Sequence, residues 1–162
     1  MSVEIFLKIP AIEGECTAKG HEKEIEVFSF SLGASNPSSV ATGAGMGAGK
    51  VDISTLSIQK QLDLASDKLF KNCCNGTHFE KATVTVREAG GESPLEYYIL
   101  ELKQVFIDSI SWGAASGGEK PSESVSLSFG EVKMTYWSQD EKGGKGQKGE
   151  VGWSLKKNAP AA

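Results

Sequence analysis

The sequence predicts a mainly β fold, a barrel or two-layer sandwich of about eight strands with one short helix at its side or end. Three observations lead to this fold class. Apolar residues alternate with period two through most of the chain, as in half-buried strands. A single segment has the apolar spacing of an amphipathic helix. Two strands change face partway along, as strands do at the corners of barrels and sandwiches.

The clearest change of face lies in residues 122–137. Apolar side chains occupy odd positions up to Phe129 and even positions from Val132 onwards. Because strand side chains alternate between faces, this parity change at Gly130 indicates a β-bulge or a sharp bend within one long strand.

Residues 24–32 show a second change of face. Ile25 and Val27 share one side of the predicted strand, whereas Phe28 and Phe30 share the other. Strands that are apolar on both faces carry more apolar surface than one small core requires. We therefore expect part of this surface to form contacts between subunits.

The other strands follow from the same alternation. Strands are expected at residues 1–9 and 51–60, in a hairpin over 82–106, and at 107–113 and 150–157. The hairpin turn falls at Gly90-Gly91, which tolerate positive φ angles, and a break near 106–108 separates its second strand from the next. Residues 142–149, which contain Lys142, Lys145 and Lys148, are expected to form an exposed, mobile basic tip.

Residues 66–76 are predicted to form the helix. Ser66 or Asp67 can cap its start, and Asn75-Gly76 can end it in the left-handed conformation. Its apolar stripe consists of two i, i+4 pairs, Leu69 with Cys73 and Phe70 with Cys74.

Residues 33–50 are rich in Gly, Ala and Ser and are expected to form a long loop without an element of its own. A phosphate-binding P-loop is excluded, because its first glycine position is Ala44 and Val51 follows Lys50. The dinucleotide pattern fits Gly43, Gly45 and Ala48, but a strand pattern follows where that motif requires a helix.

Length and charge limit the classes of function. The 162 residues suit one domain, and a net charge of −4 argues against a general nucleic-acid binder. The first residues lack the order of a signal peptide, and no apolar run has the length of a membrane span. Folding in the cytoplasm is expected, and any export would use a route that needs no such signal.

No catalytic or metal-binding constellation is recognisable, so neither an enzyme nor a cofactor is expected. His21 and His78 lie in polar segments and are expected on the surface, although a ribonuclease-like histidine pair stays open. Three cysteines make a poor disulfide framework, and Cys73 and Cys74 are expected to be buried structural thiols.

The serines are patterned. Ser124, Ser126 and Ser128 share one strand face, and Ser29 and Ser31 share another. Such a surface is polar, uncharged and flat. It is either an ordinary solvated face or a smooth lining past which other proteins sit or slide. A monomeric barrel that binds a small ligand through its tryptophans, Trp112, Trp137 or Trp153, is the alternative.

Several segments in order resemble one protein family. They are IFLKIPAIEGE, the pattern around His21 to Ser31, the glycine-rich loop ending in GAGKV, the helix ending in CCNGTHF, and REAGGESPLEYY. Their order, their spacing and the chain length resemble the haemolysin-coregulated proteins, the tube proteins of bacterial type VI secretion systems.

This resemblance implies a two-sheet β-barrel over residues 1–157 with one short helix on its side, followed by a flexible tail at 158–162. It implies hexameric rings that stack into a tube, inside a contractile sheath and beneath a spike protein. The tube would be secreted and would carry effector proteins in its lumen, without nucleic acid, membrane insertion, cofactor or metal. By position, the resemblance assigns Ser29 and Ser31 to the lumen. The subunit or ring contacts it suggests are Gly43, Gly45, Gly47 and Gly49.

Overall fold

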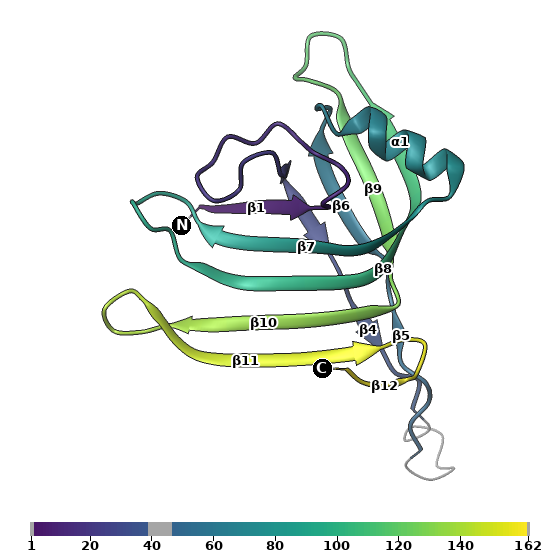
Figure 1. The fold of residues 1–162 in the computed structure, drawn as a ribbon, viewed down its shortest axis with the longest axis vertical. Coiled ribbons are helices and arrows are strands. Elements are labelled where there is room, and N and C mark those ends of the chain that lie inside the picture. The colour runs from purple at the N-terminus through teal and green to yellow at the C-terminus, as the bar shows by residue number, and fades with distance from the viewer. Residues whose placement is uncertain (1, 39–46, 162) are drawn as a thin grey trace.

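The chain folds as a mainly β structure with one short helix, as the sequence predicts (Figure 1). The computed structural model describes residues 2–38 and 47–161. The helix is α1 (Ser66–Asn75). The longer strands are β1 (Val3–Lys8), β6 (Leu56–Gln61), β7 (His78–Glu88), β8 (Glu96–Gly113), β9 (Ser122–Ser128), β10 (Glu131–Gln139) and β11 (Lys145–Ser154). The shorter strands are β2 (Ile25–Val27), β3 (Ser29–Ser31), β4 (Ala34–Ser35), β5 (Asp52–Ile53) and β12 (Ala159–Pro160).

Strand β8 belongs to both arms of a bent sheet. One arm has the strand order β12-β11-β10-β8-β7-β1-β2, and the other runs from β8 through β9 and β6 to β3. Figure 1 shows β6 and β9 running across the direction of β7, β10, β11 and the first half of β8, whose second half bends and pairs with β9. The sheets are open, so the expected closed barrel is wrong. The strand predicted at 24–32 is divided at Phe28 into β2, which pairs with β1, and β3, which pairs with β6.

The bend at Gly130 is confirmed, but it separates two strands and is not a bulge within one. Strands β9 and β10 both pair with β8, β9 with its second half and β10 with its first. Strand β8 itself continues through the break expected at 106–108, where the register shifts at Asp108. A bulge leaves one residue unpaired without ending the strand, which explains the difference.

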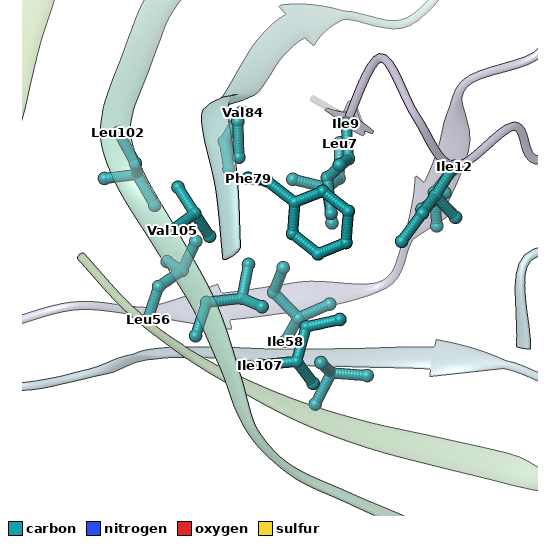
Figure 2. Close-up of a cluster of buried hydrophobic side chains, with 14 of the residues drawn as sticks. Leu7, Ile9, Ile12, Leu56, Ile58, Phe79, Val84, Leu102, Val105 and Ile107 are labelled. Carbon is teal, nitrogen blue, oxygen red and sulfur yellow. The ribbon is translucent and has the colours of Figure 1, made fainter. Parts of the chain in front are cut away.

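The core lies between the two arms (Figure 2). Its buried side chains include Leu7, Ile9, Ile12, Leu56, Ile58, Phe79, Val84, Leu102, Val105 and Ile107. Each such side chain contributes about 1.5–3 kcal/mol on burial. Segments distant in sequence are therefore held together by one apolar cluster.

Helix α1 covers one end of this core, but only part of its predicted stripe is buried. Leu69 is buried and Cys73 packs partly against the core, whereas Phe70 is 46% exposed and Cys74 is exposed. The expected burial of both cysteines is therefore wrong for Cys74 and only partly right for Cys73. All three cysteines of the chain are free thiols, as expected, and Cys16 is buried.

The caps of helix α1 differ from the prediction at its N-terminus and agree with it at its C-terminus. The N-cap is Ala65, so neither Ser66 nor Asp67 caps the helix as predicted. Asp63 takes part of that role, because its Oδ1 accepts the Ala65 N–H at 2.9 Å. At the other end, Gly76 adopts φ 71° and donates its N–H to the Asn72 carbonyl, as the sequence indicates.

Three segments expected to be irregular contain strands. The first part of the segment 33–50 holds β4, which pairs with β5, and an isolated bridge joins Ser38 to Ala48. Lys145 and Lys148, expected in a mobile tip, belong to β11. Strand β12 pairs with the end of β11 within the segment assigned to a tail. Gly90 and Gly91 both have positive φ in the turn between β7 and β8, as predicted.

Candidate functional site

One face of the β3-β6-β9-β8 arm is lined by small, uncharged polar side chains. The strand registers align them in two rows across four strands. The first row consists of Ser31, Ser57, Ser126 and Ser109, and the second of Ser29, Gln59, Ser124 and Ser111. We call these eight residues the serine face. Its members are exposed or half-buried, because the core lies on the opposite side of the sheet.

Two irregularities in β8 complete this face. Leu100 and Leu102 point into the core, then Val105 and Ile107 do so after the positive φ of Gln104. The register shift at Asp108 changes the parity again, and Ser109 and Ser111 consequently point away from the core.

The serine face differs from an ordinary solvated sheet surface. Two of its members on neighbouring strands are hydrogen-bonded, because Ser124 Oγ donates to Gln59 Oε1 at 2.7 Å. The outward surface of the other arm is instead crossed by ion pairs, such as Lys81–Glu101 at 3.3 Å. There, a hydrogen bond with Lys148 lowers the pKa of Glu150. Charge is thus concentrated on one arm and absent from both rows of the other.

Ser29 and Ser31, the residues expected at the lumen, belong to this face together with the predicted Ser124 and Ser126. The four members from β6 and β8 were missed by sequence reasoning. Ser57 and Gln59 lie in the regular alternation of β6, whereas Ser109 and Ser111 reach this face only after the register shift at Asp108. Ser128, the third serine of that strand, lies beyond the rows and donates its hydroxyl to Asp108 Oδ1 at 2.8 Å.

A second surface is apolar and uncovered. The core-facing side of β8 continues onto β10 and β11, where fewer elements cover it. Its exposed members are Met134 at 41%, Tyr136 at 50% and Val151 at 58%. Met134 pairs with Val151 across β10 and β11, and Tyr136 pairs with Tyr98 across β10 and β8. We call Tyr98, Met134, Tyr136 and Val151 the apolar overhang.

We call residues 33–38 and 47–53 the arm, in which β4 pairs with β5 and Ser38 pairs with Ala48. Gly47 and Gly49 lie within the described residues, whereas Gly43 and Gly45 lie outside them. Gly49 donates its N–H to the Pro37 carbonyl at 2.9 Å, and its carbonyl accepts from Asn36 Nδ2 at 2.9 Å. A Cβ at Gly49 would lie 2.6 Å from the Pro37 carbonyl oxygen, so this close approach requires glycine.

His21 is not on the surface, contrary to expectation. Its ring is buried, stacks on Phe6 at 4.2 Å, and lies between two carboxylates. Nδ1 is 2.9 Å from Glu24 and Nε2 is 2.6 Å from Glu96. Sequence reasoning missed this site because Glu96 is distant in the chain. His78 is exposed as predicted, and its ring lies 4.9 Å from that of Phe106, so the two histidines have different partners.

A buried polar cluster beneath α1 was also missed. Lys60 and Glu123 are both almost fully buried, are register partners on β6 and β9, and form a hydrogen-bonded ion pair. Lys60 also contacts Asp63 Oδ1 at 2.9 Å, and Ser66 Oγ donates to Glu123 at 2.9 Å. The strict alternation of β6 and β9 places both charged residues on the core side. This alternation could have predicted the buried pair from the sequence.

Among the described residues no group of three or more histidine, cysteine or acidic side chains is arranged to hold a metal ion. Within the same residues, no helix has the length and apolar character needed to cross a membrane.

Comparison with known proteins identifies the family. Residues 6–136 match the family model described as type VI secretion system effector, Hcp. Protein hcp1 of Pseudomonas aeruginosa is 38% identical over 162 residues, which cover 99% of this chain and 100% of that protein.

Solved structures agree with this match over nearly the whole chain. A type six secretion system protein superposes with a TM-score of 0.92 at 31% identity, covering 99% of this chain and 100% of the other. Hcp1 from Salmonella typhimurium has a TM-score of 0.83 at 33% identity, with the same coverage. The resemblance drawn from the sequence is confirmed, and a monomeric ligand-binding barrel is not favoured. The chain therefore belongs to the Hcp family of type VI secretion system proteins.

Proposed function

We propose that this chain is a structural subunit of the secretion tube, that six copies close into a ring, and that the serine face lines the lumen. The observation that carries the proposal is the alignment of seven serines and one glutamine, all uncharged, in two rows across four strands. Because this lining carries no charge, it offers no tight binding site to a protein that travels along it. Its hydroxyls can still form weak hydrogen bonds with a cargo surface.

The apolar overhang supports assembly into rings. Exposed apolar side chains that continue a core face are typical of contacts between subunits. A second copy of the chain is the occupant we propose, through a heterologous contact that closes after six copies. A stable contact of this kind buries more than about 1,000 Å² in total.

The arm, residues 33–38 and 47–53, supports stacking of rings. Figure 1 shows β4 and β5 at the end of the molecule opposite α1. An arm projecting from one end suits contact with the next ring. We therefore retain Gly43, Gly45, Gly47 and Gly49 as ring-contact residues, with Gly49 acting by shaping the base of the arm.

The tube is further proposed to lie inside a contractile sheath, to carry a spike protein at its tip, and to take effector proteins into its lumen. The chain would reside in the cytoplasm before firing and be secreted by the type VI system. This protein would then act as carrier and chaperone without catalysis. That role is in keeping with a family of secretion proteins rather than enzymes.

A charge placed on the serine face tests the lumen assignment. Ser31→Glu should reduce co-purification of effector proteins expressed with the chain, while the ring of six 17.2 kDa chains, about 103 kDa, persists in native mass spectrometry. Ser93→Glu, a matched change in the exposed β7-β8 turn, should leave both measurements unchanged. Unaltered loading of every cargo by Ser31→Glu would remove the lumen assignment. A monomeric wild-type chain would instead remove the ring.

A further inference from the structure

A surface groove beside α1 has features that the tube function does not use. It has a volume of about 610 Å³, within the range of small-molecule and side-chain binding pockets. Its lining residues are Glu13, Gly14, Leu62, Asp63, Leu64, Ser66, Asp67, Lys68, Phe70 and Trp112. Apolar, aromatic and acidic side chains therefore meet in one concave site.

Two aromatic side chains form one wall of the groove. Phe70 of α1 and Trp112 of β8 lie with ring centroids 5.2 Å apart, and each is 46% exposed. The Trp112 indole N–H donates to Glu123 Oε1 at 3.0 Å, and Glu123 is completely buried. The hydrogen bond fixes the orientation of the indole and leaves its ring face open to a ligand.

The charge around these aromatic rings is negative. The lining carries the carboxylates Glu13, Asp63 and Asp67 against the single ammonium of Lys68. Adding the buried pair Lys60 and Glu123 beneath it leaves four carboxylates against two ammonium groups. The N-terminus of α1 contributes a positive partial charge of only about half a unit. The net field therefore favours a cation.

We propose that this groove docks an arginine side chain, flanked by an apolar residue, from a partner protein. A guanidinium stacks on aromatic faces and pairs with carboxylates in the same plane, which an ammonium does less well. Leu62 and Leu64, which are 38% and 65% exposed, would cover the flanking apolar residue.

The groove and the serine face lie on opposite sides of the sheet. Ser111 belongs to the serine face, and its neighbour Trp112 points to the other side, where it meets Glu123. The arginine partner therefore does not compete with cargo on the serine face. The inference stands independently of the lumen assignment.

Fluorine NMR on the intact assembly tests the proposal directly. The chain has three tryptophans, so incorporation of 5-fluorotryptophan gives three resonances, which single Trp→Phe variants assign. The probe is the capped peptide Gly-Leu-Arg-Leu-Gly, and its control carries neutral, isosteric citrulline in place of arginine. The Trp112 resonance should shift saturably, those of Trp137 and Trp153 should stay in place, and the citrulline peptide should bind about tenfold more weakly.

Two double variants test whether the carboxylates of the groove bind the arginine side chain. Glu13→Gln with Asp67→Asn should weaken the arginine peptide by about tenfold. Glu80→Gln with Glu92→Gln removes the same charge from exposed sites elsewhere and should have no effect.

Four results would overturn the proposal. They are no shift up to about 10 mM peptide, equal binding of the citrulline peptide, equal shifts at all three tryptophans, and equal loss in the control pair.

Discussion

Gln104 and Gly130 face each other at the corner where the two arms of the sheet meet. A Cβ added to Gly130 would lie 3.3 Å from both Cβ and Cδ of Gln104 and closer still to its amide oxygen. Gln104 has φ 57°, and the Gly130 N–H donates to the neighbouring Lys103 carbonyl at 2.9 Å. The bend in β8 and the bend between β9 and β10 are therefore one feature, in which each strand leaves space for the other.

Gly130→Ala should destabilise the protein by about 1–3 kcal/mol, because the added methyl group meets an occupied site. In a Gln104→Gly background the cost should fall by at least about 0.5 kcal/mol, since the two sites are coupled. Urea unfolding at fixed protein concentration measures both values. Gly33→Ala is the control, because nothing lies within 4 Å of its added Cβ. If the free-energy effects of Gly130→Ala and Gln104→Gly are additive, the bend in β8 and the bend between β9 and β10 are independent features.

Lys60→Met should be strongly destabilising, by about 3–5 kcal/mol, because it leaves the buried Glu123 carboxylate without its cation. Lys60→Met with Glu123→Gln should recover much of this loss, since no buried charge is then left unpaired. Thermal and urea unfolding of the wild type, the single variant and the double variant measure these differences in stability. A double variant as unstable as the single one would mean that packing, rather than charge, is what Lys60 supplies.

The fold class was predictable because period-two alternation survives in almost every strand. The corner at Gly130 was predictable for the same reason, since Phe129 and Val132 fall on different parities. Whether the sheet closes into a barrel could not be predicted from the sequence. It depends on whether β2 and β3 pair as one strand across Phe28, and hydrogen-bond partners are not encoded in the alternation itself.

The serine face was half predictable. Ser29, Ser31, Ser124 and Ser126 were visible as local patterns, but Ser109 and Ser111 join them only after the register shift at Asp108. The site around His21 was predicted wrongly. His21 is buried, stacks on Phe6 and contacts Glu96, which is 75 residues away in the chain.

The thiols should differ in reactivity in the order of their exposure. Burial raises the pKa of Cys16 above its usual 9.0, so its thiol stays protonated and shielded in the folded protein. With Ellman's reagent at pH 8, exposed Cys74 should react first, Cys73 more slowly, and Cys16 only after unfolding. The stability contributed by the neutral Cys16 thiol is present below about pH 9 and is lost as the pH rises above it. Fast reaction of Cys16 in the native protein would contradict its burial.

Gly49→Ala should distort the base of the arm, because the added methyl group would lie 2.6 Å from the Pro37 carbonyl oxygen and 2.8 Å from Pro37 Cγ. On the proposed role of the arm, rings should form normally while their stacking decreases. Native mass spectrometry reports the ring, and negative-stain microscopy at high concentration reports stacks. Gly33→Ala again serves as the matched control. Stacking that survives Gly49→Ala unchanged would remove the arm from the ring contact.

Val151→Glu should separate the subunits without unfolding them. Val151 is 58% exposed in the isolated chain, so a charged side chain there meets little of the chain's own core. In the proposed ring the same carboxylate would be buried unpaired in the apolar overhang, which costs several kcal/mol per contact. Sedimentation velocity should show the 17.2 kDa monomer with an unchanged far-UV circular dichroism spectrum. Ser111→Glu adds the same charge to the serine face and should keep the ring. If Val151→Glu also keeps the ring, the apolar overhang is not the subunit contact, and another exposed surface must close it.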